Sequence, residues 1–515
     1  ACSFTAQFFA TKASCGFAAK LRQAMFDHIQ SLSFTELDTM GTDTLITRLT
    51  DDVNQVQNGL NLGLRLLLRS PFVVLGSMVM AFTIHAELAS IYLIAVVVLG
   101  TCLILIMSRA VKYFQKVFQK YDDLNASVQE NITGIRVVKA YVREDYENQK
   151  FFKAAENVYR MFVKAENIIV ANQPLMMFTV YACILGLSWL GAKMIVVGSL
   201  TTGELMSLLT YCMNIMMSLM MLSMIFVMVT MSFASAERIT EVLNEKSDLQ
   251  NPENPVTEVK DGSIVFNHVD FAYRKSSGEP VLKDINIEIH SGETIGIIGG
   301  TGSAKSSLVN LISRLYDASE GSVQVGGVDV RDYDMEALRN QVSVVLQKNV
   351  LFSGTILENL RWGDKNATEE ECIRACQLAC ADEFIERMPE KYHTYIEQGG
   401  SNVSGGQKQR LCIARALLKK PKILILDDST SAVDTATDAK IRRAFAEEIP
   451  DTTKLIIAQR ISSVQGADRI IVMDNGRING IGTHEELLAS NAIYRDVYES
   501  QTGGSGDFDE NGGEA

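Results

Sequence analysis

Apolar residues form four long runs in the first half of the chain, and each is long enough to cross a bilayer, which takes about 20 residues. The runs cover roughly residues 66–84, 88–107, 168–190 and 205–233. A minimal turn at residues 85–87 joins the first pair, and a short loop around Gly198 joins the second pair. This pattern predicts an all-α, polytopic membrane domain over residues 1–240.

Two long polar stretches, residues 16–65 and 108–167, keep a helical periodicity, so we expect the helices to continue beyond the membrane. Each stretch has a break, at residues 33–38 and 131–135. The second stretch is rich in Lys and Arg, whereas the short loops are nearly free of them. The positive-inside rule therefore predicts that this stretch and both chain ends lie in the cytoplasm.

Two features of the spans leave alternatives open. Arg69 lies near the cytoplasmic end of the first span, where snorkelling to the interface is favoured over contact with a substrate. Methionine is flexible and polarizable, so the methionines of the last span either line an adaptable apolar pathway or simply pack and face lipid. They are Met206, Met213, Met216, Met217, Met220, Met221, Met224, Met228 and Met231.

The pattern changes after Phe233. A polar stretch with Pro252 and Pro255 predicts a linker over residues 241–261. Short apolar strands then alternate with helices over residues 262–501, which predicts an α/β domain with a largely parallel sheet. The acidic, Gly-rich residues 502–515 are typical of a disordered tail.

Composition adds two exclusions. The 515 residues are 47% hydrophobic, which excludes disorder as the main state. The net charge of −13 argues against nucleic acid as a partner, since such proteins present a basic face.

A glycine-rich run follows the predicted strand 294–298 and opens a helix at Ser307, the context that a P-loop requires. Its backbone N–H groups suit phosphate, Lys305 suits the β- and γ-phosphates, and Ser306 suits Mg²⁺. The run consists of Gly299, Gly300, Thr301, Gly302, Ser303, Ala304, Lys305 and Ser306. Ala304 stands where glycine is usual, and a left-handed backbone there would cost about 1–2 kcal/mol and weaken nucleotide binding.

Three further positions point to the same chemistry. The apolar strand 423–426 ends at Asp427, which is placed to hold Mg²⁺. Gln347 ends the strand 342–346 and could add a metal or water contact. A second helix start suited to anions is formed by Ser404, Gly405, Gly406 and Gln407.

Together these motifs resemble the ATP-binding cassette (ABC) family, in the arrangement of an exporter half-transporter. The resemblance implies roles for Gln347 as the Q-loop, Val403–Gln407 as the signature, Asp427 as Walker B and residues 431–434 as the D-loop. It also implies that Tyr273 stacks on adenine, and that ATP and Mg²⁺ bind.

The family has six spans per half-transporter, so the first span and most of the second are expected to be missing, with residues 3–10 as the tail of the second. The two breaks resemble coupling helices. In the family, each ATP lies between the P-loop of one chain and the signature of the other.

Two departures from the family concern hydrolysis. Asp428 stands where the family has the Glu that polarises the attacking water, and Gln459 stands where it has the switch His. A carboxylate misplaced by about 1 Å can cost about 10²-fold in rate. Gln can neither carry charge nor shuttle protons. With Ala304, these changes predict an ATP site that hydrolyses slowly.

The signature residues are intact, so they are expected to serve a competent site on a different chain. This pattern resembles the degenerate-site subunit of bacterial heterodimeric exporters. The resemblance implies export of multidrug or other small amphipathic compounds, in contact with lipid in the cytoplasmic membrane. The alternatives are a slow homodimer, a homodimeric lipid or peptide exporter, or a non-transporting membrane regulator gated by ATP.

Smaller motifs favour structural roles. Cys372, Cys376 and Cys380 recur at helical spacing and are expected to be buried thiols rather than metal ligands. Thr368 and Thr483 each precede a glutamate by three residues, which predicts capping boxes.

Overall fold

A computed structural model describes residues 2–273, 279–428 and 433–502. The chain separates into two compact units. The first contains residues 1–31 and 40–246, and the second contains residues 32–39 and 247–515. The sequence-based boundary at residue 240 therefore lies close to the observed division. The short segment 32–39 was not expected to belong with the second unit.

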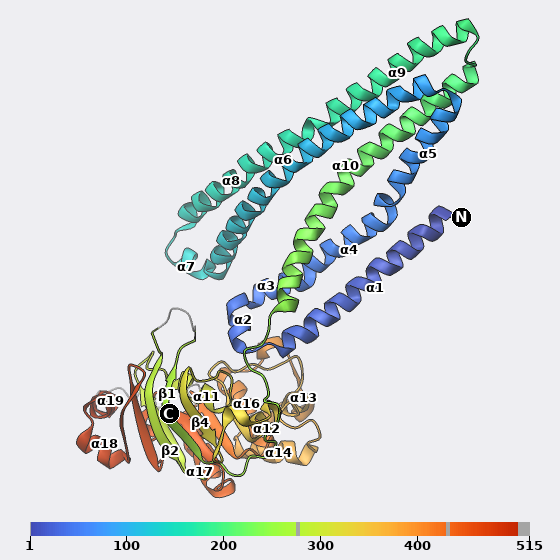
Figure 1. Cartoon of the computed structure of the whole chain (residues 1–515). Helices are drawn as coiled ribbons and strands as arrows, with labels where there is room; N and C mark the ends of the chain where they lie inside the picture. The colour runs from blue at the N-terminus through green and yellow to red at the C-terminus, as the bar shows by residue number, and fades with distance from the viewer. Residues whose placement is uncertain (1, 274–278, 429–432, 503–515) are drawn as a thin grey trace. The chain divides into compact units, whose positions relative to one another are not determined.

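The first unit consists of long helices, as the periodicity predicted (Figure 1). Helix α6 runs beside α8 and α9, and α10 runs beside α4 and α5. The helices are α1 (Cys2–Ser31), α3 (Thr42–Thr47), α4 (Val53–Leu62), α5 (Arg69–Ile84), α6 (Ala86–Thr133), α7 (Ile135–Ala140), α8 (Glu144–Val170), α9 (Asn172–Val197) and α10 (Thr202–Asn244). Two π-helical turns, Arg48–Asp52 and Gly63–Leu67, interrupt the run from α3 to α5.

Among the residues that the structure describes, four helical segments are long and apolar enough to cross a membrane, which agrees with the four predicted spans. They are Thr42–Ile84, Ala86–Thr133, Glu144–Val197 and Thr202–Leu222. The connections are also as short as expected: His85 alone separates α5 from α6. After α9, Gly198 adopts a left-handed conformation with φ 82°, and a Thr201–Glu204 capping box starts α10.

Both predicted breaks are present. Helix α6 ends at Thr133, and Gly134 separates it from the short α7. At the other break, α1 ends at Ser31 and the short helix α2 (Phe34–Met40) follows. The buried Glu36 carboxylate accepts a hydrogen bond of 2.9 Å from the Ser33 backbone N–H, and thus fixes the start of α2.

Helix α10 continues to Asn244, eleven residues beyond the last apolar position of the predicted span at Phe233. The extension is held by an ion pair between Arg238 and the buried Asp52 carboxylate, in which Nε donates to Oδ2 over 2.9 Å. Ile239 and Val242 are also buried. The irregular linker therefore begins at Glu245 rather than at residue 241.

The second unit is an α/β domain, as predicted. Its central sheet has six strands in the order β12-β11-β3-β10-β9-β6, and all neighbours are parallel except β11 and β12. The strands are β3 (Thr294–Gly299), β6 (Val342–Val345), β9 (Ile423–Asp427), β10 (Thr453–Ile457), β11 (Arg469–Asp474) and β12 (Arg477–Gly482). Every residue of β9 and β10 is buried, which explains the near-continuous apolar sequence of β9 and the apolar Leu455–Ile457 of β10.

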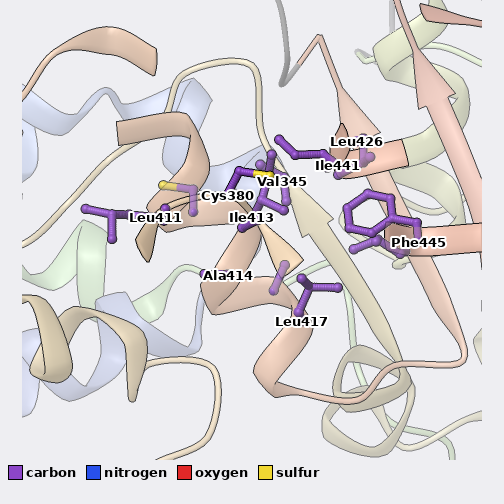
Figure 2. Packing of buried hydrophobic residues seen from close by; sticks show 14 of the residues in the cluster. Val345, Cys380, Leu411, Ile413, Ala414, Leu417, Leu426, Ile441 and Phe445 are labelled. Atoms are coloured by element: carbon purple, nitrogen blue, oxygen red, sulfur yellow. The ribbon is translucent and has the colours of Figure 1, made fainter. Parts of the chain in front are cut away.

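Helices cover this sheet and form its core. Figure 2 shows Val345 of β6 and Leu426 of β9 among apolar side chains of α16 (Gly405–Leu418) and α17 (Thr435–Glu448). The other helices of the unit are α11 (Lys305–Ile312), α12 (Met335–Gln341), α13 (Ile356–Leu360), α14 (Glu369–Leu378), α15 (Asp382–Ile385), α18 (His484–Ser490) and α19 (Ala492–Thr502). Cys372, Cys376 and Cys380 are buried in this core, as expected. The capping boxes at Thr368 and Thr483 are confirmed.

A second, antiparallel sheet has the order β2-β1-β4-β5. Its strands are β1 (Ile264–Phe271), β2 (Leu282–Ile289), β4 (Glu320–Val325) and β5 (Val328–Asp329), and a separate pair is formed by β7 (Gly354–Thr355) and β8 (Tyr395–Ile396).

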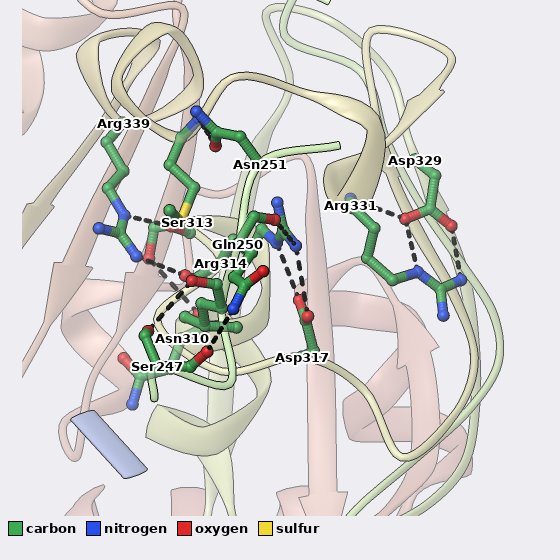
Figure 3. Close-up of polar contacts among 12 residues, drawn as sticks. Ser247, Gln250, Asn251, Asn310, Ser313, Arg314, Asp317, Asp329, Arg331 and Arg339 are labelled. Carbon is green, nitrogen blue, oxygen red and sulfur yellow. Dashed lines mark hydrogen bonds and ion pairs between the residues drawn. The ribbon is translucent and has the colours of Figure 1, made fainter. Parts of the chain in front are cut away.

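The linker is attached to the second unit by buried polar contacts (Figure 3). The Arg314 guanidinium pairs with Asp317 at 3.0 Å and donates to the Gln250 carbonyl at 3.1 Å. Arg339 donates to the Arg314 carbonyl at 2.7 Å. These contacts fasten the linker to the chain segment that follows α11.

Candidate functional site

The glycine-rich run forms a loop between β3 and the N-terminus of α11. A side chain at Gly299 would clash, because its Cβ would lie 2.3 Å from the Met473 carbonyl oxygen. The Lys305 Nζ lies inside the loop and donates to the carbonyls of Gly299 and Gly300, both at 2.8 Å. The loop therefore brings one ammonium group to the N-terminus of α11, an arrangement that suits phosphate.

Ala304 has φ 71° and ψ 24°, a left-handed conformation. Ala304 therefore adopts the left-handed backbone for which the sequence analysis gave the cost. Its backbone strain, about 1–2 kcal/mol for a residue with a Cβ, is already present in the folded loop.

Asp427 lies at the carboxyl end of β9, where its carboxylate accepts a hydrogen bond from the Ser306 hydroxyl. Burial raises the pKa of Asp427, and the Ser306 hydrogen bond opposes the rise. Burial likewise lowers the pKa of Lys305, against the attraction of Asp427 and Asp428. Two hard oxygen ligands beside a lysine fit Mg²⁺ together with phosphate.

Asp428 follows directly, with φ 47°, and its side chain is 9% exposed. Its Oδ2 accepts a hydrogen bond of 2.8 Å from Gln459 Nε2 and a longer one of 3.4 Å from Gln347 Nε2. Gln459 and the expected Q-loop residue Gln347 therefore meet at one oxygen of the Asp428 carboxylate.

These groups line a cavity of about 570 Å³. Its lining contains the whole P-loop from Gly299 to Ser307, together with Gln347, Asp427, Asp428, Gln459, Val281, Ile298, Ile457 and Val497. The predicted phosphate, metal and hydrolysis residues are therefore brought together, and the volume suits a small-molecule ligand.

Tyr273 is placed beside this cavity rather than in its lining. Its hydroxyl shares a 2.8 Å hydrogen bond with Ser307 Oγ, and its ring packs edge-on against Phe271 and Tyr316. The side chain is 41% exposed, so a ring surface is available to a base. The stacking role remains a prediction.

Tyr316 connects the same aromatic cluster to α2. Its hydroxyl donates to Asp38 Oδ2 at 2.9 Å, and its ring lies 6.2 Å from that of Phe34. Burial raises the pKa of Tyr316, and the hydrogen bond to Asp38 acts in the same direction. Sequence reasoning missed this contact, because nothing local marks two residues 278 positions apart as partners.

The signature residues lie at the N-terminus of α16. Ser404 Oγ accepts from the Gln407 N–H at 3.3 Å, and Gln407 Oε1 accepts from the Ser404 N–H at 3.0 Å. Ser404 and Gly405 are exposed, and within the described part of the chain no signature residue lines the P-loop cavity. The structure thus does not join the signature to the P-loop within this chain.

The D-loop lies partly outside the described residues, which include Val433 and Asp434 but not Ser431 and Ala432. Asp434 caps α17 by accepting a hydrogen bond of 2.9 Å from the Thr437 N–H.

Comparisons with known proteins match both units. The family model "ABC transporter transmembrane region" matches residues 1–220, and the model "ABC transporter" matches residues 282–431. The chain is 37% identical to the uncharacterized ABC transporter ATP-binding protein YfiB of Bacillus subtilis (strain 168), over 97% of this chain and 86% of that protein. The fold is similar to the structure of a bacterial Atm1-family ABC exporter with ATP bound, with a TM-score of 0.84 and 25% identity, over 96% of this chain and 87% of that one.

The chain belongs to the ABC exporter family. It is a half-transporter in which a multi-pass membrane domain is fused to an ABC ATPase domain, and it couples ATP hydrolysis to transport. Another relative, the ATP-dependent lipid A-core flippase of Desulfotalea psychrophila (strain LSv54 / DSM 12343), is 34% identical over 93% of this chain and 84% of that protein. ABC exporters act as dimers, so the exposed signature is available to a second half-transporter.

One further residue at the site escaped sequence reasoning. Gln501 of α19 holds the backbone that follows Gln459: its Nε2 donates to the Gln459 carbonyl at 2.8 Å, and its Oε1 accepts from the Ile461 N–H at 2.9 Å. A glutamine near the end of a polar helix carries no sequence signal for such a role.

Proposed function

We propose that this chain is one subunit of a heterodimeric ABC exporter, and that its own P-loop site binds ATP but hydrolyses it slowly. The signature on α16 would then serve a competent site whose P-loop belongs to the other subunit. The proposed cargo is a small amphipathic compound, in the manner of multidrug exporters.

The observation that carries the proposal is the environment of Asp428. Two neutral amides, Gln459 and Gln347, donate to the same carboxylate oxygen. A general base must reach the proton it removes, and the group that orients it should stabilise the charge that develops. Here the carboxylate is one methylene shorter than the family's glutamate, and its partner at position 459 cannot become cationic. Both features favour binding over turnover.

Binding itself is well supported by the residues present. Lys305 and the P-loop N–H groups would orient the phosphates, and Ser306 and Asp427 would hold Mg²⁺ through their oxygens. A bound Mg²⁺ ion neutralises negative charge on the phosphates. Lys305 would lose its contacts to two loop carbonyls and gain phosphate oxygens, which are stronger, charge-assisted acceptors.

A lipid is the second candidate cargo, because a 34% identical relative is named as a lipid A-core flippase. That cargo would be compatible with a homodimer. A homodimer differs from the proposed heterodimer in one measurable respect. Its P-loop sites must hydrolyse ATP without a subunit of different sequence.

The test is the fate of bound nucleotide. The full-length protein, reconstituted alone in lipid nanodiscs, would be loaded with radiolabelled ATP and Mg²⁺, freed of unbound nucleotide and sampled over time. The proposal expects the bound label to remain ATP over many minutes, and a Lys305→Met control to retain little label. Rapid conversion of the bound label to ADP by the protein alone would contradict it.

A further inference from the structure

The membrane unit contains a cavity of about 800 Å³, a volume within the usual range for small-molecule sites. It lies among α5, α6, α9, α10 and the adjoining ends of neighbouring helices. Four methionines of α10 line it: Met217, Met220, Met221 and Met228. Flexible thioether side chains suit apolar ligands of varied shape.

Arg69 is the one ionisable residue in this lining, among the residues that the structure describes. In the described parts of the chain, no acidic side chain forms an ion pair with it. The lining also includes the amides of Gln173 and Asn214, which are neutral donors and acceptors. The cavity therefore presents one positive charge and, among its described lining residues, no negative charge.

The same lining lacks the groups that hold organic cations. Across the described residues, it contains no carboxylate and no aromatic ring. Cationic ligands are usually bound by negative charge or by the faces of aromatic rings. A cationic amphiphile would instead meet the Arg69 guanidinium, so charge alone selects against it.

The backbone before Arg69 explains why this arginine, and not its neighbour, lines the cavity. Residues four apart on a regular α-helix share a face, so Arg65 and Arg69 would point the same way. Arg65 lies within the π-helical turn Gly63–Leu67, in which the Leu68 N–H is bonded to the Gly63 carbonyl at 3.3 Å, and Arg69 follows that turn. Such a turn rotates the residues that follow it and is frequent at functional sites. Arg69 lines the cavity, whereas Arg65 does not.

We propose that this cavity binds an amphipathic anion, with its anionic group on the Arg69 guanidinium and its apolar body on the α10 methionines. The proposal names the class of cargo and so rests on the proposed export function. It replaces the expectation that Arg69 only snorkels to the interface. Snorkelling alone would give Arg69 the same role as Arg65.

The first test compares two probes with the same ring system. 8-Anilinonaphthalene-1-sulfonate is an anion, and N-phenyl-1-naphthylamine is its neutral counterpart without the sulfonate. Fluorescence titration of the full-length protein in nanodiscs, with empty nanodiscs subtracted, gives both dissociation constants. Arg69→Gln is expected to weaken binding of the sulfonate at least tenfold and to leave the neutral probe within twofold. Arg69→Lys should restore most of the sulfonate affinity, because it keeps the charge.

Arg65→Gln is the matched control, since it removes an arginine from the same helix one turn away. It should leave both probes unchanged. Equal effects of the two substitutions on the sulfonate would favour snorkelling and overturn the proposal. So would an Arg69→Gln variant that binds the sulfonate as well as the unaltered protein does.

A second measurement needs no variant, and therefore stands even if Arg69→Gln fails to fold, which loss of the neutral probe would reveal. Bound sulfonate probe is displaced from the unaltered protein by octyl sulfate or by octyltrimethylammonium, both below their micellar concentrations. Octyl sulfate should act at a concentration at least tenfold lower. Equal potency, or better displacement by the cation, would overturn the proposal.

Failure of this inference is distinguishable from failure of the proposed function. If the chain holds ATP without hydrolysing it but shows no preference for anions, only the class of cargo is wrong. If the anion preference holds but the chain alone hydrolyses ATP rapidly, the slow-site proposal is wrong and the cavity assignment remains.

Discussion

The P-loop and the signature helix of this chain make an informative comparison. Both place the N-terminus of a helix where phosphate can bind, yet they differ in how well they meet the family's pattern. Helix α11 follows an alanine in a left-handed conformation and faces a carboxylate bound by two neutral amides. Helix α16 begins with a complete capping box and has no departure among Ser404–Gln407. Every departure therefore falls on the side that carries out hydrolysis, as expected if the two sides serve different ATP molecules.

The largest effect is predicted for a substitution in the signature. In the exporter assembled with its other subunit, Ser404→Ala should lower steady ATP turnover at least about 10²-fold, because loss of one preorganised donor at a reacting phosphate costs that much. The control is Thr368→Ala, which removes another capping-box residue in the same domain. That variant should lose stability but retain turnover. Similar turnover in both variants would show that Ser404 acts only as a helix cap.

The next effect concerns the P-loop lysine. Lys305→Met should weaken binding of ATP to this chain by about 10- to 100-fold, because hydrogen bonds to a charged group contribute about 1.5–3 kcal/mol. In the assembled exporter it should reduce steady turnover much less than Ser404→Ala does. Parallel measurements of nucleotide affinity and turnover check both statements. If the Lys305→Met exporter were as inactive as the Ser404→Ala exporter, the P-loop and the signature of this chain would contribute equally to turnover, which would contradict the proposal.

A smaller effect is expected at Gln501, whose two hydrogen bonds hold the backbone around Gln459. Their loss in Gln501→Ala should cost about 1–2 kcal/mol locally and increase amide hydrogen exchange at residues 459–461. Ser500→Ala, which removes only a contact within α19, is the control. Unchanged exchange in Gln501→Ala would mean that other contacts hold the segment.

The smallest effect is at Ala304. Glycine accepts φ 71° without strain but loses more conformational freedom on folding, so Ala304→Gly should stabilise the fold by about 0.5–1 kcal/mol. Ala446→Gly, at an exposed position inside α17, should destabilise it by about 1 kcal/mol. Thermal unfolding of the two variants should therefore shift in opposite directions. Shifts of the same sign would contradict the strain at Ala304.

Sequence patterns predicted what local residues determine. The four spans follow from apolar run length, and the phosphate loop follows from glycines between a strand and a helix. Asp427 and Gln347 could be placed because parallel strands end at one edge of a sheet, so residues distant along the chain meet there. The cost of a left-handed backbone at Ala304 followed from the glycine that is usual there, whereas the conformation itself is seen only in the structure.

Contacts that depend on tertiary packing could not be predicted in this way. The Arg238–Asp52 pair lengthens α10 and displaces the linker, yet its partners are 186 residues apart. The Tyr316–Asp38 hydrogen bond places α2 with the second unit, and Gln501 reaches Gln459 from another helix. Common polar residues form these pairs, so their spacing carries no signal. The position of Arg69 in the cavity lining likewise follows a π-helical turn that periodicity did not reveal.

The central claim is that Asp428 and Gln459 make this chain's own ATP site slow. It is tested most directly by ATP turnover of the full-length protein, purified alone in lipid, beside the double variant Asp428→Glu, Gln459→His. In the double variant, the longer carboxylate should reach the attacking water, and the histidine can become cationic. ATP turnover should therefore rise by about 10²-fold from a negligible level, while the affinity for ATP stays nearly unchanged. Rapid turnover by the unaltered chain, with no gain in the double variant, would contradict the account and indicate a self-sufficient homodimer.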